Sequence, residues 1–229
     1  MNVRAAPDAA RGFHFALALS IFAIVTSSTS PRAADDNVPI TLLAFGDSLT
    51  AGYGVKINES FPAQLQMALQ AKGHKVEIIN AGVSGDTTAG GLERLDWSLQ
   101  AKPDGVILEL GANDALRGTD PKEARANLDK MLATLKSKGV DVLLAGMKAP
   151  NNWGPEYVKG FDAIYPELTA KYGVVLYPFF LDGVALDPTL VQADGLHPTA
   201  AGIAVIVKRL LPDVEVLLEH IAQSKTAVK

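Results

Sequence analysis

Cysteine is absent from the 229-residue chain, which excludes a disulfide, a thiolate nucleophile and a cysteine-ligated metal. An excess of basic residues is also missing: 21 lysines and arginines stand against 25 aspartates and glutamates, and the formal net charge of −4 gives no basic footprint for nucleic-acid binding. We see no internal repeat and no low-complexity linker after the N-terminal segment. The fold must therefore rest on an apolar core, which a hydrophobic fraction of 48% permits.

Long hydrophobic runs are rare, and the one near the N-terminus spans residues 13–25. Arg4 and Arg11 precede it, and small residues follow it, with Ser30, Ala33 and Ala34 as candidate cleavage positions. A run of this length is typical of a signal peptide and short for a membrane span, although an uncleaved anchor is the alternative. We predict a signal peptide over residues 1–34, one domain over residues 35–229, and a periplasmic or secreted protein without a stable membrane span after signal removal.

Short apolar runs alternate with longer amphipathic ones along the rest of the chain. This alternation predicts an α/β fold, a three-layer sandwich in which helices cover both faces of a five-stranded parallel sheet. Pro166 interrupts one predicted helix and should kink or break it. The predicted strands are Ile40–Phe45, Val76–Asn80, Gly105–Leu110, Val140–Ala145 and Val174–Tyr177; the predicted helices are Pro62–Ala71, Thr87–Leu99, Pro121–Lys138, Pro155–Lys171 and Thr199–Ala222.

Conspicuous polar residues follow the predicted strands, where open α/β sheets bind their ligands. Ser48 follows the first strand, Gly82 the second and Asn113 the third, while Asp194 and His197 follow the fifth. A serine hydroxyl becomes a nucleophile when an imidazole takes its proton and a carboxylate orients that imidazole. We therefore predict Ser48, His197 and Asp194 as nucleophile, base and orienting acid of a hydrolase.

Four motifs in this order resemble those of the SGNH (GDSL) hydrolase superfamily. They read Gly46-Asp47-Ser48-Leu49, Asn80-Ala81-Gly82-Val83-Ser84-Gly85-Asp86-Thr87, Glu109-Leu110-Gly111-Ala112-Asn113-Asp114 and Asp194-Gly195-Leu196-His197-Pro198. With Asn151-Asn152-Trp153-Gly154, the chain looks most similar to the thioesterase I/lysophospholipase/arylesterase branch, of which many members are periplasmic. The resemblance implies a flavodoxin-like sheet, hydrolysis of a small-molecule acyl ester or thioester, and an oxyanion hole from the backbone N–H groups of Ser48 and Gly82 and the side-chain amide of Asn113.

Apolar residues near the motifs predict where a substrate binds. We expect an acyl chain to contact Leu49, Val83, Met147, Pro150 and Trp153, and we also note Leu116, Leu181 and Val184. Because Asp194 and His197 form the only close acid–histidine pair within the four motifs, we expect no metal and no cofactor.

Three other functions compete with an acyl esterase or thioesterase. A carbohydrate O-acetyl esterase uses the same catalytic groups, and Asn151 and Asn152 offer contacts for sugar hydroxyls. A non-catalytic ligand-binding protein on the same fold would have no need of Ser48, Asp194 and His197 together. A receiver-like phosphoacceptor would use Asp47, but it leaves the Asp194–His197 pair unexplained.

Overall fold

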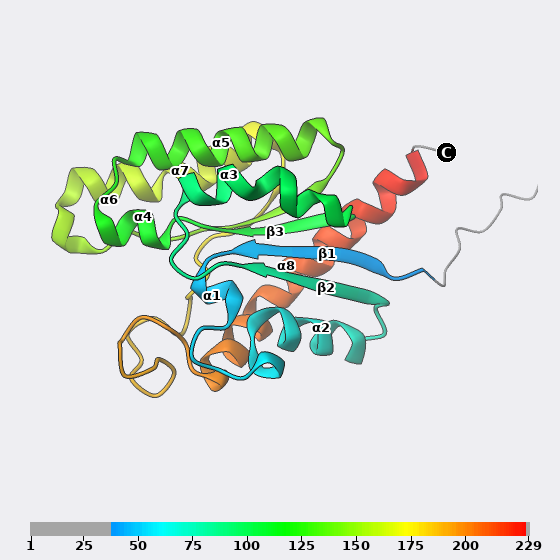
Figure 1. Ribbon diagram of the computed structural model, residues 1–229, viewed down its shortest axis with the longest axis horizontal. Coiled ribbons are helices and arrows are strands. Elements are labelled where there is room, and N and C mark those ends of the chain that lie inside the picture. The colour runs from blue at the N-terminus through cyan, green and yellow to red at the C-terminus, as the bar shows by residue number, and fades with distance from the viewer. Residues whose placement is uncertain (1–37, 228–229) are drawn as a thin grey trace, which may run out of the picture. The chain divides into compact units, whose positions relative to one another are not determined.

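The computed structural model describes residues 38–227 (Figure 1). Five strands form one sheet in the order β2-β1-β3-β4-β5, and every neighbouring pair is parallel. The predicted α/β class and five-stranded parallel sheet are confirmed. The strands are β1 (Ile40–Gly46), β2 (Val76–Gly82), β3 (Gly105–Glu109), β4 (Asp141–Ala145) and β5 (Val175–Tyr177).

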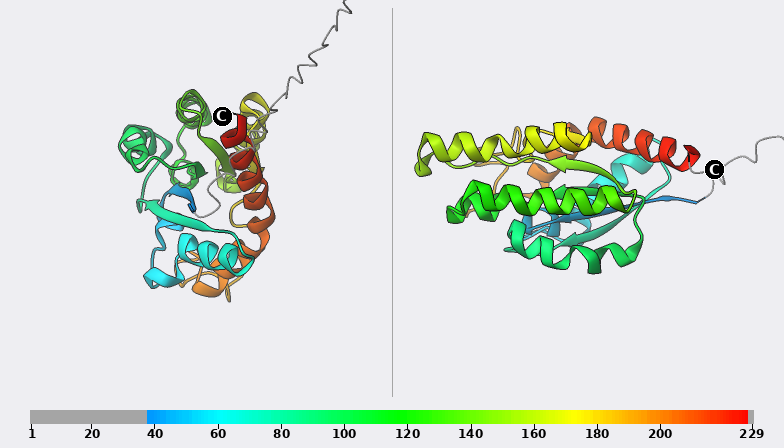
Figure 2. Two further views of the ribbon diagram at one scale, coloured as in Figure 1. Left: turned by 90° about the vertical axis from the view of Figure 1, so that its right-hand side faces the viewer. Right: turned by 90° about the horizontal axis from the view of Figure 1, so that it is seen from above.

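Helices cover both faces of this sheet (Figures 1 and 2). Helices α2 and α8 pack against each other on one face, and α3, α5 and α7 lie on the other. The central strands are buried accordingly: all five residues of β3 and the last five of β1 are buried. The helices are α1 (Ser48–Ala51), α2 (Phe61–Ala71), α3 (Thr88–Ser98), α4 (Ala112–Arg117), α5 (Pro121–Ser137), α6 (Pro155–Asp162), α7 (Ile164–Tyr172) and α8 (Ala200–Ala227).

The predicted helix over Pro155–Lys171, which was expected to kink or break because of Pro166, divides into α6 and α7. Pro166 has no N–H to donate to the carbonyl of Asp162, where α6 ends. The helices differ from the sequence prediction mainly in two other places. The last helix extends to Ala227 and contains Pro212. Helices α1 and α4 were not predicted, and both directly follow a central strand.

The predicted export segment, residues 1–34, lies outside the residues that the structure describes. Between residues 38 and 227, no helix is long and apolar enough to cross a membrane. In the described domain, the loops after β1, β2, β3 and β4 and the long connection after β5 carry the polar motifs. The site is therefore built at the carboxyl ends of the strands.

Candidate active site

Ser48 begins helix α1 at a tight turn that directly follows the buried strand β1. Asp47 caps α1: its Oδ1 accepts a hydrogen bond from the backbone N–H of Leu49 at 2.9 Å. Ser48 is the first residue of the helix and is 9% exposed. The strand end and the cap thus fix the serine backbone, while its hydroxyl faces the loops from the other strands.

The long connection after β5 brings an imidazole to this hydroxyl. Nε2 of His197 lies 2.8 Å from Oγ of Ser48, and Nδ1 lies 2.7 Å from Oδ2 of Asp194. Since an ionised carboxylate only accepts hydrogen bonds, Nδ1 carries the ring proton and Nε2 accepts from the serine. The structure therefore brings the three predicted residues together in a geometry suited to proton transfer from Ser48.

Asp194 is held in its ionised form by its own loop. Its Oδ1 accepts hydrogen bonds from the backbone N–H groups of Leu196 and His197, at 2.9 and 3.0 Å. The Leu196 N–H, followed by the imidazole of His197 and its backbone N–H, lowers the pKa of Asp194 to about 2. Asp194 is therefore a carboxylate throughout the neutral and mildly acidic range.

Gln192 joins the loop of the base to the loop of the nucleophile. Its side-chain Nε2 donates to the carbonyl of Tyr53 at 2.8 Å and to that of Pro198 at 2.9 Å. Its backbone N–H donates to the carbonyl of His197 at 2.7 Å. The Tyr53 ring also lies against the imidazole, with centroids 4.5 Å apart. None of these contacts was predicted, because a glutamine in a loop carries no pattern in the sequence.

The structure places Gly82 in a different role from the predicted oxyanion donor. Its N–H donates to Oδ1 of Asn80 at 3.0 Å, and Gly82 does not line the cavity beside Ser48. A Cβ at this position would lie 2.2 Å from the backbone N of Ala51, so Gly82 allows the end of β2 to pack closely on α1. The glycine is required for packing there.

Gly85, in the same motif, does line that cavity together with Ser48. Its φ of +85° favours glycine, and in the described part of the chain neither its N–H nor that of Ser48 has a protein acceptor. These two N–H groups are free to bind an oxyanion. The positive φ that distinguishes Gly85 from Gly82 is a property of the backbone and has no separate signal in the sequence.

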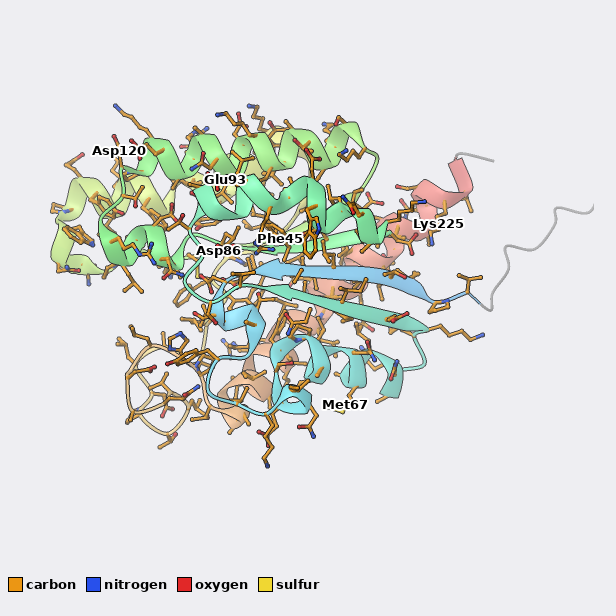
Figure 3. All side chains as sticks on the ribbon, viewed as in Figure 1. Phe45, Met67, Asp86, Glu93, Asp120 and Lys225 are labelled. Carbon is orange, nitrogen blue, oxygen red and sulfur yellow. The ribbon has the colours of Figure 1, made fainter. Side chains whose placement is uncertain are left out.

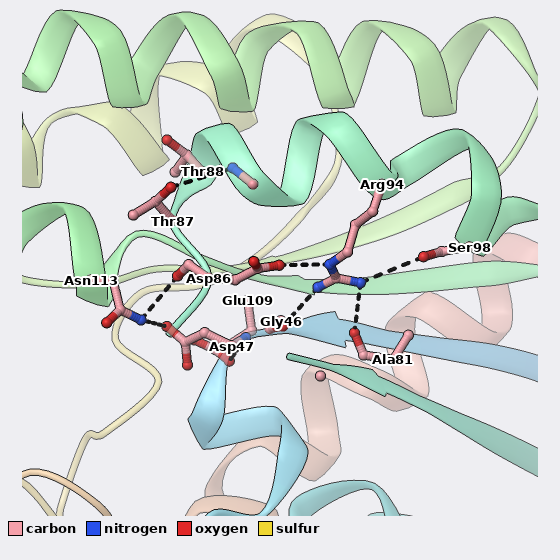
Figure 4. Close-up of polar contacts among 12 residues, drawn as sticks. Gly46, Asp47, Ala81, Asp86, Thr87, Thr88, Arg94, Ser98, Glu109 and Asn113 are labelled. Carbon is pink, nitrogen blue, oxygen red and sulfur yellow. Dashed lines mark hydrogen bonds and ion pairs between the residues drawn. The ribbon is translucent and has the colours of Figure 1, made fainter. Parts of the chain in front are cut away.

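Asn113 stands at the start of α4 and also lines the cavity. Its Nδ2 donates to Oδ2 of Asp47 at 3.1 Å and to the backbone carbonyl of Asp86 at 2.9 Å (Figure 4). An amide has two N–H donors, so both are engaged in this state. A substrate oxyanion must share or replace one of these acceptors.

Arg94 connects the ends of β1 and β2 to Asp86, the residue whose carbonyl binds Asn113 (Figure 4). Its guanidinium donates to the carbonyls of Gly46 and Ala81, at the ends of β1 and β2, and to the carboxylate of Asp86. It also lies 3.9 Å from the centroid of the Phe45 ring. Arginine suits this position because its planar fork presents several donors at once.

A cavity of about 580 Å³ opens beside Ser48 and His197. Of the predicted substrate contacts, Leu49, Met147 and Pro150 line it, and Val83 and Trp153 do not. The Trp153 indole instead donates to the carbonyl of Ala115 at 2.8 Å, which ties its loop to α4. The other apolar residues of the lining are Tyr53, Ala112, Ala115, Leu116, Ala149, Phe179, Leu181, Ala185, Leu186, Val191 and Leu196.

Known proteins are similar to this chain in sequence and fold. Residues 44–205 match the GDSL-like Lipase/Acylhydrolase family. The chain is 40% identical over 179 residues to "Esterase TesA" of Pseudomonas aeruginosa, covering 78% of this chain and 89% of that protein. It is 46% identical over 158 residues to "Arylesterase" of Vibrio mimicus, covering 69% and 79%.

The solved structure of AlinE4, described as an SGNH-hydrolase family esterase, is 49% identical. It superimposes with a TM-score of 0.67, covering 79% of this chain and 97% of that one. The sequence match and this fold likeness extend over the domain that carries Ser48, Asn113, Asp194 and His197. The chain therefore belongs to the GDSL-like lipase/acylhydrolase family and is an ester hydrolase.

Proposed function

We propose that this protein hydrolyses acyl esters or thioesters of medium or long acyl chains, with Ser48 as the nucleophile. The observation that carries the proposal is the chain of contacts from Asp194 through His197 to Ser48, at 2.7 and 2.8 Å, beside an apolar cavity. The names of the similar proteins, an esterase and an arylesterase, support the same reaction class.

Each step follows from the roles of these groups. Oγ of Ser48 bonds to the acyl carbon while its proton passes to Nε2 of His197, and Asp194 stabilises the resulting imidazolium. The carbon–oxygen or carbon–sulfur bond of the substrate then breaks, and the leaving group takes the proton from Nε2. Water attacks the acyl-enzyme with the same base, which releases the carboxylic acid and restores Ser48.

The tetrahedral oxyanion needs donors that are already in position. We assign this role to the backbone N–H groups of Ser48 and Gly85 and to the side-chain amide of Asn113, with Gly85 in place of the predicted Gly82. The support is that all three residues line the cavity and that two of the N–H groups have no protein acceptor within residues 38–227. Donors of this kind stabilise charge that develops only in the transition state.

The apolar wall of the cavity favours a substrate with a medium or long acyl chain. Met147 is 3% exposed, and Phe179 and Leu181 lie with it along the cavity. Burial of each acyl methylene against such a wall contributes up to about 0.8 kcal/mol of favourable binding free energy. An O-acetyl esterase would gain nothing from this wall, although Asn151 and Lys148 also line the cavity and offer polar contacts.

Turnover of p-nitrophenyl esters from acetyl to palmitoyl tests this assignment. We expect kcat/KM of the wild type to rise by an order of magnitude or more over the first few added methylenes. Met147→Ala should flatten that rise, because it removes part of the wall. The matched control is Met67→Ala: Met67 is 54% exposed on α2 (Figure 3) and should leave the profile unchanged.

A profile that peaks at acetyl and is the same in Met147→Ala would transfer the proposal to an O-acetyl esterase. Labelling with a fluorophosphonate separates both hydrolases from a ligand-binding protein, because only an activated serine reacts. A thioesterase is tested in the same series with acyl-CoA and a lysophospholipase with lysophospholipid.

We also propose that residues 1–34 direct export to the periplasm or the medium. The support is the apolar run over residues 13–25 with Arg4 and Arg11 before it. Expression of the full chain in a Gram-negative host, followed by fractionation and intact-mass measurement, should show an exported protein cleaved between residues 30 and 35. An uncleaved protein in the membrane fraction would indicate an anchor.

A further inference from the structure

Glu109 ends the central strand β3 directly beneath the turn that carries Ser48, and the mechanism above gives it no role. It is fully buried. Its Oε2 contacts the hydroxyl of Thr50 at 2.7 Å and accepts from the backbone N–H of Asp47 at 3.4 Å. A buried carboxyl group at the end of an apolar strand requires a physical reason.

The turn is packed around this carboxyl group. A Cβ added at Gly46 would lie 2.2 Å from Oγ1 of Thr50 and 2.5 Å from Oε2 of Glu109. The glycine before Asp47 therefore leaves space for the contact between Thr50 and Glu109. Through Thr50 on one side and the backbone N–H of Asp47 on the other, Glu109 holds the chain both before and after Ser48.

The buried carboxyl groups of Asp47 and Glu109 lie close together, and they differ in the hydrogen bonds that their oxygens accept. Asp47 accepts one N–H on each oxygen, from Leu49 and from Asn113. In contrast, Oε1 of Glu109 has no hydrogen-bond partner within the described domain. An ionised carboxylate needs donors for both oxygens, so Asp47 is the better site for a negative charge and Glu109 the better site for a proton.

Electrostatics favour the same assignment. Burial, followed by the charge of Asp47, raises the pKa of Glu109 well above its usual range. Burial also raises the pKa of Asp47, to about 6, so that Asp47 is mostly ionised at pH 7. Two such close groups share their protons, and near neutral pH the pair holds one negative charge.

We propose that Glu109 is a positioning residue that acts as a neutral carboxylic acid: it holds the Ser48 turn through Thr50 and Asp47, and it leaves the pair's negative charge on Asp47, which orients Asn113. The effect on turnover rests on the proposed function, because Ser48 and Asn113 act there. The protonation state of Glu109 does not depend on it.

Infrared spectroscopy tests the protonation state directly. At pH 7, the wild type should show a carboxylic-acid C=O band that shifts in D₂O and is absent from Glu109→Gln. Thr50→Val, which is close in shape, should shift this band because the acid loses its hydroxyl partner. Without a band assignable to Glu109 at pH 7, the proposal of a neutral acid is wrong, whatever the enzyme hydrolyses.

Kinetics test the positioning role. Glu109→Ala should lower kcat by about tenfold or more with a much smaller change in KM, because the turn loses its support. Glu109→Gln, which keeps an uncharged acceptor for Thr50, should recover most of that loss. Equal loss in both variants, with both folded by circular dichroism, would overturn the positioning role of a neutral group.

The pH dependence of kcat/KM is a second test of whether Glu109 carries a charge. The acid limb of kcat/KM, where the base must lose its proton, should keep its midpoint in Glu109→Gln. If Glu109 were ionised, its removal would destabilise the imidazolium and move this limb to lower pH. The other charged and titratable groups around Asp47 and Glu109 are Asp86, Arg94, Asp114, Tyr165 and His197, and both Glu109 variants keep all of them.

Discussion

Ser48→Ala is expected to abolish fluorophosphonate labelling and to lower kcat for ester hydrolysis by about four to six orders of magnitude. The hydroxyl is the only group in the proposed mechanism that bonds to the acyl carbon, and Asp194 and His197 have no other nucleophile within hydrogen-bond distance among the described contacts. Turnover of a p-nitrophenyl ester and mass spectrometry of the labelled protein measure the two effects. His197→Ala should be comparably severe, because the serine then keeps its proton.

The variant should remain folded, because alanine fits the first turn of α1 and Asp47 still caps Leu49. Ser137→Ala, at the exposed end of α5, is the matched control and should label and turn over like the wild type. Hydrolysis near the wild-type rate in Ser48→Ala would mean that another residue is the nucleophile.

Asn113→Ala is expected to lower kcat by about a hundredfold to a thousandfold with a much smaller change in KM. The amide acts on charge that develops in the transition state, so its loss appears in kcat. Asn113 also donates to Asp47 and to the carbonyl of Asp86, and these bonds fix the position of its side chain at the cavity that Ser48 also lines. Steady-state kinetics with a soluble ester measure the effect.

Asn127→Ala provides the matched comparison. The Asn127 amide donates to Oγ1 of Thr88 at 3.2 Å, a contact between α5 and the start of α3 outside the cavity. It should lower the melting temperature and leave kcat of the folded enzyme intact. The same pattern in Asn113→Ala would assign Asn113 a structural role instead of a catalytic one.

Elements with a strong local pattern could be predicted from the sequence. Strands β1 and β3 are mostly apolar runs, and α5 begins at Pro121 as predicted. Helices α1 and α4 contain four and six residues, too few for a helical period to show. Their existence depends on the sheet, because at most two residues separate each of them from the end of a central strand, and α1 is also capped by Asp47.

The site was predictable where one residue type determines the chemistry. A serine, a carboxylate and an imidazole after parallel strands have few other reasons to converge, and Ser48, Asp194 and His197 do converge. Gly82 and Gly85 cannot be distinguished by residue type, because only the backbone shows which N–H is free. Trp153 was predicted as a substrate contact because its ring is apolar. In the structure its indole N–H donates to the carbonyl of Ala115, so the side chain ties its loop to α4.

Arg94 and Glu109 were outside the prediction for a related reason. Each acts through groups that only the folded chain assembles: the ends of β1 and β2 for Arg94, and the Ser48 turn for Glu109. A charged residue inside an apolar strand, as at Glu109, is the signal that could have drawn attention to this position.

The base and its carboxylate lie three residues apart, and the carboxylate also binds the backbone of that same short loop. Their mutual geometry is therefore set locally, before the sheet is involved. The rest of the fold has to place this unit against Ser48. Gln192 links the two loops, because its side-chain amide donates to the carbonyl of Tyr53 after the nucleophile and to that of Pro198 after the base. A change in the connection after β5 would therefore alter the distance between base and nucleophile before it altered the pairing of acid and base.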